Sequence, residues 1–226
     1  MSEELDFLTR LKRIDCCALS DALDQLKMTG VVSGMIQGSG SCRIAGRAIT
    51  VRLVAGVKSE APPKHLCATA IELGGPGSII VVEQRSGIEA GSWGGLLSMG
   101  AKTRGIEGVI AEGPVRDIDQ AIDMGFPVFA RAWTALTARG RIVEQSTNGP
   151  VQIGDVVVSA GDYVLADRSA TIFVPEQEME KVLAAAERIV AKEDFMAKEI
   201  LSGTAIGTVM GANYEHMLVN GGDKMC

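Results

Sequence analysis

The strongest restriction on the fold comes from short apolar runs that alternate with helical segments between residues 78 and 130. Ser78–Glu83, Gly108–Ala111 and Pro127–Ala130 have the length and composition of buried strands. Helical patterns lie between them, over Leu96–Arg104 and over Ile118–Met124. Each helix must carry the chain back before the next strand begins, which makes neighbouring strands parallel. The sequence therefore predicts an α/β unit built on a parallel sheet.

The segments on either side of this unit predict a second layer. Between Val151 and Val174, short strands are broken by Gly-Asp turns, a pattern typical of β-hairpins. Gln177–Leu201 has the apolar spacing of a long amphipathic helix, and so has Glu4–Ile14. A further helix is expected over Asp21–Lys27, with Ser20 as its N-cap.

Length and composition indicate one domain. The chain of 226 residues is long enough for a single large core, and no break in composition divides it. We expect a single domain over residues 1–205 and a Gly- and Asn-rich tail over residues 206–226, which is loosely ordered or lies at an interface. The net charge of −6 argues against nucleic-acid binding, which needs clustered Lys and Arg side chains.

The cysteines and the N-terminus favour a cytoplasmic protein. Five cysteines are irregularly spaced and form no C-x-x-C motif, as expected of reduced thiols. The N-terminus is acidic and then mixed, unlike a signal peptide, and no apolar run is long enough to cross a membrane. Two histidines are too few for a histidine-rich zinc site. One of them, His65, follows Pro62-Pro63; we expect it at the surface, and the alternative is a place at the mouth of a ligand site.

Arg116 and Asp117 are the first candidates for a functional site. They follow the apolar run Gly108–Ala111 after an expected turn at Glu112-Gly113-Pro114. This places them at the edge of the sheet, where open α/β sheets bind their ligands. A guanidinium can hold an anionic substrate by two parallel hydrogen bonds, and a carboxylate can bind a hard metal ion. The alternative is a surface ion pair, or an acid at a helix start.

The glycine-rich loop before this strand offers a second binding group. Gly94, Gly95, Leu96 and Leu97 lead into a predicted helix. The first N–H groups of a helix have no partner within it, so they can bind an anion without a charged side chain. The loop lacks the glycine patterns of nucleotide-binding motifs, so a nucleotide site is not expected.

Several stretches, in their order along the chain, resemble one known family. They are LSDAL at 19–23, SWGGLL at 92–97, GIEGVIAEGPVRD at 105–117, the hairpin run at 154–175 and the last helix at 191–203. Together they are similar to the RraA-like family. This family includes ribonuclease regulators and the class II 4-hydroxy-4-methyl-2-oxoglutarate / 4-carboxy-4-hydroxy-2-oxoadipate aldolases. The resemblance implies a β/β/α swivelling-type sandwich, and a homotrimer or a dimer of trimers with the site between subunits.

The resemblance also implies roles for particular residues. The amides of Leu96 and Leu97 would bind the carboxylate of pyruvate, beside Arg116 as the catalytic cation. Asp117 would bind Mg²⁺ or Mn²⁺ directly. A further acid, donated by a neighbouring subunit, corresponds to Glu193; the alternative for Glu193 is a solvated acid on the long helix.

One residue departs from the aldolase pattern. The pattern has Asp or Glu where this chain has Gly95, so one acid of the metal site is missing. Glu89, in the preceding loop, is the first candidate to replace it, and Glu112 is the second. Otherwise the change means a different substrate or the loss of aldolase activity.

The sequence therefore predicts a divalent-metal-dependent lyase. It would cleave a C–C bond of a small 2-oxo dicarboxylic acid and release pyruvate, by retro-aldol cleavage or by β-decarboxylation. Two alternatives stay open: a non-catalytic regulator of the ribonuclease branch, and an enzyme that acts on a different 2-oxo or 2-hydroxy acid. The expected partners are a small 2-oxo acid, Mg²⁺ or Mn²⁺ and further copies of the chain, not a nucleic acid or a membrane.

Overall fold

The computed structural model describes residues 3–41, 43–56 and 64–211. Its strands are β1 (Val31–Val32), β2 (Ile36–Ser39), β3 (Ile44–Ala55), β4 (Ser78–Gln84), β5 (Gly108–Val115), β6 (Val128–Trp133), β7 (Ile142–Thr147), β8 (Val151–Ile153), β9 (Val156–Val158), β10 (Tyr163–Ala166) and β11 (Thr171–Val174). Its helices are α1 (Glu3–Leu11), α2 (Cys16–Gln25), α3 (Ala68–Leu73), α4 (Gly95–Thr103), α5 (Ile118–Met124), α6 (Met179–Leu201) and α7 (Ile206–Val209), with a 3-10 turn at Glu176–Glu178. None of these helices is long and apolar enough to span a bilayer.

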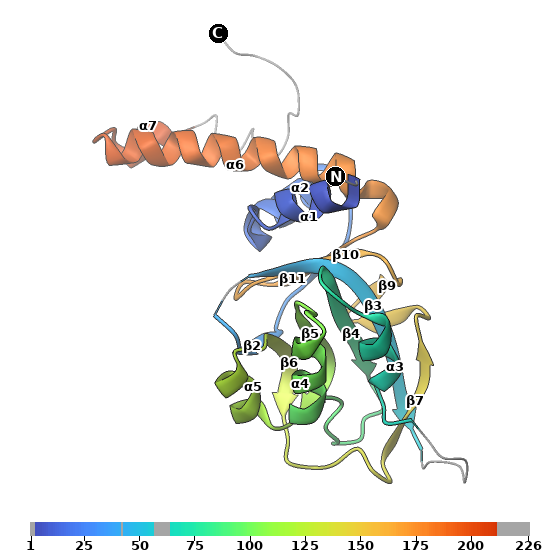
Figure 1. Cartoon of the computed structure of the whole chain (residues 1–226). Helices are drawn as coiled ribbons and strands as arrows, with labels where there is room; N and C mark the ends of the chain where they lie inside the picture. Colours follow the sequence, from blue (N-terminus) through green and yellow to red (C-terminus); the bar gives the residue numbers. More distant parts are fainter. Residues whose placement is uncertain (1–2, 42, 57–63, 212–226) are drawn as a thin grey trace.

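A curled, mixed sheet organises this part of the chain (Figure 1). Its strands run in the order β1-β11-β10-β3-β4-β5-β6-β2, and β7 pairs with β3. The four central strands, β3 to β6, are parallel. Helices α3, α4 and α5 connect them and lie together on one face of the sheet, over buried side chains such as Val82, Val109 and Ala130. The predicted α/β class is confirmed.

A second helical layer covers the other end of the sheet. Helices α1, α2 and α6 lie beyond β10 and β11, and α6 runs along α2 (Figure 1). Leu19, Leu165, Val182 and Leu183 are buried between these helices and the sheet.

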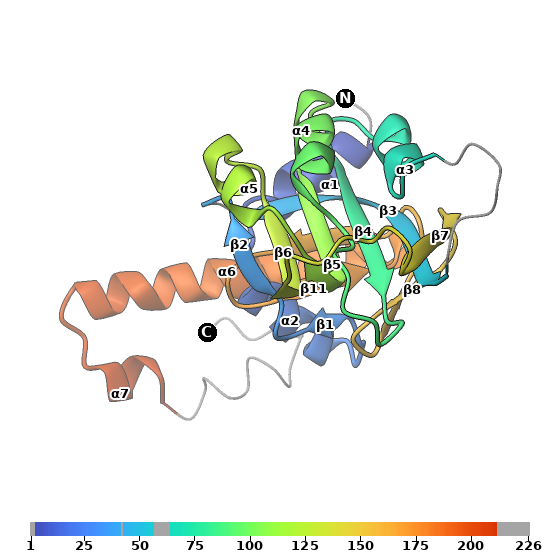
Figure 2. The same ribbon diagram turned by 90° about the horizontal axis from the view of Figure 1, so that it is seen from below.

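The antiparallel pairs β10–β11 and β8–β9 confirm the predicted hairpin layer. The second half of α6 continues beyond the body of the molecule (Figure 2).

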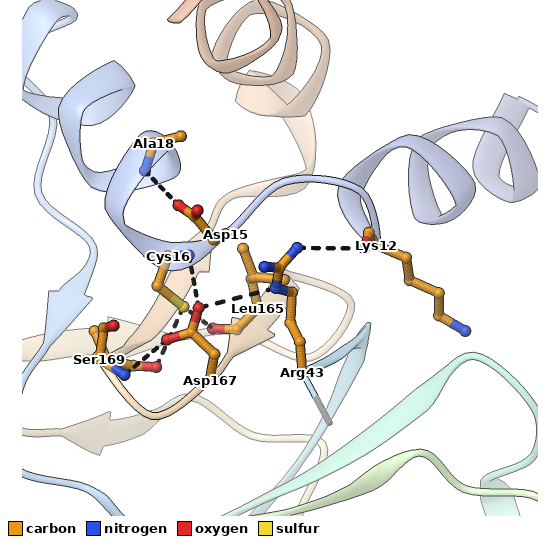
Figure 3. Close-up of polar contacts among 9 residues, drawn as sticks. Lys12, Asp15, Cys16, Ala18, Arg43, Leu165, Asp167 and Ser169 are labelled. Atoms are coloured by element: carbon orange, nitrogen blue, oxygen red, sulfur yellow. Dashed lines mark hydrogen bonds and ion pairs between the residues drawn. The ribbon is translucent and has the colours of Figure 1, made fainter. Parts of the chain in front are cut away.

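The turn after β10 fastens this helical layer to the sheet (Figure 3). Asp167 accepts hydrogen bonds from the backbone N–H groups of Cys16, at 2.9 Å, and Ser169, at 2.8 Å. The buried thiol of Cys16 lies 3.3 Å from the carbonyl oxygen of Ala170. Burial, and then the charge of Asp167, raises the pKa of this thiol. Cys16 therefore acts as a packing residue; it and Cys67 are buried free thiols.

Helix α2 begins earlier than the sequence pattern predicts. Its first residue is Cys16, and Asp15 is its N-cap, with a side chain that accepts the N–H of Ala18 at 2.8 Å. Ser20 lies inside the helix, so its prediction as the N-cap is wrong. Asp15, five residues earlier, provides the capping bond, so the helix has already begun where Ser20 was expected to cap it.

Strand β5 continues through Glu112-Gly113-Pro114, so the predicted turn there is wrong. Its register with β6 shifts between Ala111 and Pro114. This irregularity accommodates a proline, which has no N–H to donate to a neighbouring strand. The carbonyl oxygen of Pro114 accepts two hydrogen bonds from Ser92, one from its backbone N–H at 2.8 Å and one from its hydroxyl at 2.9 Å. Arg116 comes directly after the longer strand, so it still lies at the edge of the sheet, as predicted.

Of the predicted tail, residues 212–226 lie outside the described residues, and residues 206–209 form α7. Pro62-Pro63 also lies outside them.

Candidate active site

Asp117 connects two helices at the edge of the sheet. It is the N-cap residue of α5 and adopts a left-handed backbone conformation, with φ 57° and ψ 38°. Its side chain forms no capping bond with α5. Instead, Oδ2 accepts the backbone N–H of Gly95, the first residue of α4, at 3.1 Å. A left-handed conformation outside glycine is uncommon and is often found at functional sites.

Arg116 lies against the glycine-rich loop. Its backbone N–H donates to the carbonyl oxygen of Trp93 at 3.0 Å, and its Nε lies 3.2 Å from Oδ2 of Asp117. A Cβ on Gly91 would come within 2.9 Å of Arg116 Cγ, and one on Gly94 within 2.9 Å of Asp117 Oδ2. A side chain at either position would have to displace Arg116 or Asp117, because the loop backbone packs directly on these two side chains.

Trp93 supports the loop from below. Its side chain is 2% exposed, stacks on Phe126 at 6.4 Å between ring centroids, and donates from Nε1 to the hydroxyl of Ser98 at 2.9 Å. The indole N–H thus has a partner, as a buried tryptophan requires. Trp93 therefore anchors the glycine-rich loop to the core through its stacking on Phe126 and its hydrogen bond to Ser98.

The N-terminus of α4 lies beside Arg116 and Asp117. The N–H of Ser98 donates to the carbonyl oxygen of Gly94 at 3.0 Å, and this is the first hydrogen bond of the helix. The N–H groups of Leu96 and Leu97 come before it and have no acceptor within the helix. Because the peptide dipoles add a partial positive charge there, these groups can bind a carboxylate.

One cavity of about 220 Å³ brings the predicted residues together. Its walls include Gly94, Gly95, Leu96, Leu97, Arg116 and Asp117. His65 also lines this cavity, although it is exposed as expected. Leu66, Gly91 and Trp93 complete one side of the wall, and the other side comes from residues that sequence reasoning did not assign, which are Thr137, Ala138 and Arg139 in the loop between β6 and β7. No motif marks this loop; tertiary contacts bring it to the site, among them the hydrogen bond from Gly91 N–H to the carbonyl oxygen of Leu136 and the packing of Ala138 on the core.

The donor set of the cavity fits a metal ion that is held mainly by water and substrate. Asp117 is its single carboxylate, and the described residues contain no group of three or more His, Cys, Asp or Glu side chains placed to hold a metal. Mg²⁺ is often bound by one or two carboxylates and keeps several waters. Oδ1 of Asp117 contacts only Arg116 among the described residues, at 3.3 Å, and has a lone pair to offer.

The other candidate acids lie elsewhere. Glu89 accepts the hydroxyl of Thr134 at 2.8 Å and lines a separate hollow with Glu112, whose Oε2 lies 3.2 Å from Arg131 Nε. Neither glutamate lines the cavity of Arg116. Glu193 lies on α6, across the sheet from α4 within one chain (Figure 1).

The carboxylate of Glu193 has acidic neighbours in its own chain. Burial, and then the charges of Asp15 and Asp21, raises its pKa. Glu193 does not line the cavity of Arg116 in a single copy of the chain.

The position of the missing acid is filled by another side chain. A Cβ on Gly95 would lie 1.9 Å from Oε1 of Gln120 and 3.3 Å from Cβ of Asp117. The carboxamide of Gln120, from α5, thus occupies the space that a side chain at residue 95 would need. Sequence reasoning missed Gln120, because the contact joins the first turns of two different helices.

Comparison with known proteins identifies the family. The model of the RraA-like family, described as Aldolase/RraA, matches residues 16–173. This range contains β1 to β10, most of β11, the glycine-rich loop and the Arg116–Asp117 pair. The chain therefore belongs to the RraA-like family.

Individual relatives carry names from both branches of the family. The chain is 27% identical over 197 residues to a protein of Halalkalibacterium halodurans that is provisionally named 4-hydroxy-4-methyl-2-oxoglutarate aldolase, with 87% of this chain and 90% of that protein covered. The crystal structure of an uncharacterized protein from Pseudomonas syringae pv. tomato has a TM-score of 0.81 and 26% identity, over 92% of this chain and 94% of that one. Streptomyces coelicolor RraAS2, an unusual member of the RNase ES inhibitor RraA family, shares the fold with a TM-score of 0.75 at 21% identity, over 84% and 94% of the two chains.

Proposed function

We propose that the protein is a divalent-metal-dependent lyase that cleaves a C–C bond of a small 2-oxo dicarboxylic acid and releases pyruvate. Its substrates would be of the 4-hydroxy-4-methyl-2-oxoglutarate or oxaloacetate type, or of the 4-carboxy-4-hydroxy-2-oxoadipate type, which carries a third carboxylate. One observation supports this most directly. The cavity combines a guanidinium, a carboxylate and the N-terminus of a helix, from Arg116, Asp117 and α4.

These groups can hold the pyruvoyl half of such a substrate. The N–H groups of Leu96 and Leu97 would bind its carboxylate, and the guanidinium of Arg116 would lie beside the 2-oxo group. Negative charge develops on this oxygen when the C–C bond breaks and an enolate forms. Arg116 stays charged throughout and stabilises the enolate electrostatically in a partly enclosed site.

Asp117 would hold Mg²⁺ or Mn²⁺ in this cavity. The bound ion would supply Lewis acidity to the 2-oxo group. The hydrogen bond from the Gly95 N–H holds Oδ2 of Asp117 in place. Because the carboxylate is planar and rigid, this bond also orients Oδ1, the oxygen that would face the metal ion.

The test is a coupled pyruvate-release assay on oxaloacetate and on 4-hydroxy-4-methyl-2-oxoglutarate, with Mg²⁺ and with EDTA. We expect release that EDTA abolishes and that Arg116→Ala lowers by about 100-fold or more. Arg168→Ala removes an exposed guanidinium outside the cavity and is the control. If the native protein releases pyruvate from neither substrate, the proposal is wrong.

A regulatory role is the second candidate, because Gly95 lacks the acid of the aldolase pattern and because RraAS2 shares the fold. A regulator would not need both Arg116 and Asp117, which this chain retains. Capture of a ribonuclease with sub-micromolar affinity, together with no pyruvate release, would favour this role. Nucleic acid itself is not an expected partner of a chain with net charge −6.

We further propose a cytoplasmic homotrimer or dimer of trimers in which Glu193 reaches the cavity of a neighbouring copy. The second half of α6 leaves the body of the molecule and exposes Phe195 and Leu201, at 63% and 86%. Large apolar side chains on a projecting helix are typical of subunit contacts. Free, buried Cys16 and Cys67 are compatible with a reducing compartment.

A further inference from the structure

Arg139 is the cation of the cavity that the proposed reaction leaves without a role. It lines the same 220 Å³ cavity as Arg116 and Asp117 but comes from a different element, the loop of residues 134–141 between β6 and β7. Arg116 already pairs with Asp117. The guanidinium of Arg139 has no ion pair or hydrogen bond within the described ranges, and the residue is exposed as well as lining the cavity. Its charge is therefore available to a ligand.

The loop that carries Arg139 is held against the site. The carbonyl oxygen of Leu136 accepts the N–H of Gly91 at 2.8 Å, and the hydroxyl of Thr134 donates to Glu89 at 2.8 Å. The hydroxyl of Thr137 accepts the N–H of Arg139 at 3.3 Å. These bonds join the loop to the glycine-rich segment beneath the cavity. Arg139 therefore has a defined backbone position, and only its side chain needs to be ordered by a ligand.

A dicarboxylic substrate has two charged ends, and the site offers a partner for each. The first carboxylate is assigned above to the N-terminus of α4. A second carboxylate that enters the cavity gives up part of its water shell and gains from a cation or several hydrogen-bond donors. Apart from Arg116, Arg139 is the only Arg or Lys among the described residues of the cavity wall. The volume is smaller than the range of about 300–1,000 Å³ that is typical of drug-sized ligands, and suits a short-chain acid.

We propose that Arg139 binds the distal carboxylate of the substrate and so selects 2-oxo dicarboxylic acids that undergo aldol cleavage. The inference rests on the proposed lyase function. In 4-hydroxy-4-methyl-2-oxoglutarate, the C3–C4 bond breaks and its electron pair passes to C3. The C4 hydroxyl gives its proton to solvent water as C4 becomes a ketone, and C3 later takes a proton from solvent water, so two pyruvate molecules result. The distal carboxylate keeps its charge throughout, and Arg139 can hold it in the ground state and in the transition state.

Oxaloacetate differs at this end. Its distal carboxylate itself leaves as CO₂ when the C3–C4 bond breaks, and its negative charge flows into C3. A cation on that carboxylate opposes this movement of charge, so Arg139 does not assist decarboxylation. The two substrates share the pyruvoyl half and therefore depend equally on Arg116. They differ only in what they require of Arg139.

The experiment compares Arg139→Ala with the native protein on both substrates, in the presence of Mg²⁺. We expect kcat/KM for 4-hydroxy-4-methyl-2-oxoglutarate to fall roughly 10- to 100-fold, mainly through KM, because a charge-assisted hydrogen-bonded pair is lost. Decarboxylation of oxaloacetate should change less than about threefold. Arg139→Lys should retain part of the aldol activity, and Arg168→Ala should retain all of it. An equal loss on both substrates, or no loss on either, would overturn the inference while the lyase function stands.

A binding measurement separates this inference from the proposed function. 2-Oxoglutarate has the distal carboxylate but lacks the C4 hydroxyl, so it cannot be cleaved in this way, and pyruvate lacks the distal carboxylate. By titration calorimetry, Arg139→Ala should weaken binding of 2-oxoglutarate roughly 10-fold or more and leave binding of pyruvate unchanged. This result would support the assignment even if the native protein released no pyruvate. Equal affinities of the native protein and Arg139→Ala for 2-oxoglutarate would refute it.

Discussion

Asp117 combines an unusual backbone conformation with a charge that the proposed chemistry needs. Its φ of 57° lies in the left-handed region, which Asn tolerates as well as Asp does. We expect Asp117→Asn to keep its melting temperature within about 2 °C of the native value, while metal-dependent pyruvate release falls about 100-fold or more. Asp117→Val should instead cost roughly 1–2 kcal/mol of stability, because a β-branched residue is strained there. Full activity of Asp117→Asn would remove this carboxylate from the mechanism.

Gly95 is the residue at which this chain departs from the aldolase pattern. An aspartate there must displace the Gln120 carboxamide, which lies 1.9 Å from the position of the added Cβ. We expect the double variant Gly95→Asp/Gln120→Ala to bind Mn²⁺ on the order of 10- to 100-fold more tightly than the native protein, because it restores a carboxylate beside Asp117. Gly95→Asp alone should gain less. Calorimetric titration with Mn²⁺ measures both, Gln120→Ala is the control, and an unchanged affinity of the double variant would contradict the argument.

At the residue scale, the sequence identifies the side chains that follow a strand or open a helix. Arg116, Asp117 and the loop from Gly94 to Leu97 were all predicted from such positions, and the structure brings them to one cavity. Arg139 could not be predicted, because its loop is joined to the site by long-range hydrogen bonds and by packing of Ala138 on the core. Gln120 was missed for a related reason: its contact with Gly95 depends on how two helices pack, which no local pattern records.

At the scale of elements, the alternation of strands and helices was sufficient to predict the parallel unit. The bounds were less predictable where a side chain or a register shift decides them. Asp15 caps α2 in place of Ser20, and β5 passes through Pro114 because its pairing with β6 is irregular there. Both errors come from competing local signals, since Asp and Ser are good N-caps and Gly-Pro usually ends a strand.

Helices α1 and α6 are tied by an ion pair that makes stability depend on pH. Nε and Nη2 of Arg10 each donate to one oxygen of Glu187 at 2.7 Å. These hydrogen bonds lower the pKa of Glu187, against the effect of its partial burial. Both side chains are partly exposed, so we expect Glu187→Gln to cost only about 0.5–1 kcal/mol near neutral pH.

This contribution should disappear in acid. A carboxylate with a lowered folded pKa stabilises the protein above its unfolded pKa, here 4.5, and loses this effect as the pH falls through the folded pKa. Urea unfolding from about pH 3 to pH 7 measures the difference between the native protein and Glu187→Gln, which should be constant above about pH 5.5 and shrink below pH 4.5. Glu180→Gln, on the same helix and without an ion pair in the described chain, is the control. A difference that persists at the lowest pH would exclude the ion pair as its cause.

At the scale of the whole molecule, Glu193 lies outside the cavity of its own chain, so a site that includes it needs a second copy of the chain. In one chain it lies on α6, on the far side of the sheet from α4 (Figure 1). Burial, and then the charges of Asp15 and Asp21, raises its pKa. A carboxylate in this setting gains from a cation that a second copy can bring. The exposed Phe195 and Leu201 on the same half of α6 are suited to such a contact.

Mixing of inactive subunits tests whether sites are shared. We expect Arg116→Ala and Glu193→Gln each to lose most pyruvate release as pure proteins. When the two are unfolded and refolded together in equal amounts, a site can combine the intact Arg116 of one subunit with the intact Glu193 of its neighbour. Random assortment in a closed ring gives such sites with a frequency of about one quarter, so roughly a quarter of the native activity should return. No recovery in mixed oligomers, confirmed by light scattering, would place Glu193 outside the active site; a monomeric native protein would exclude shared sites altogether.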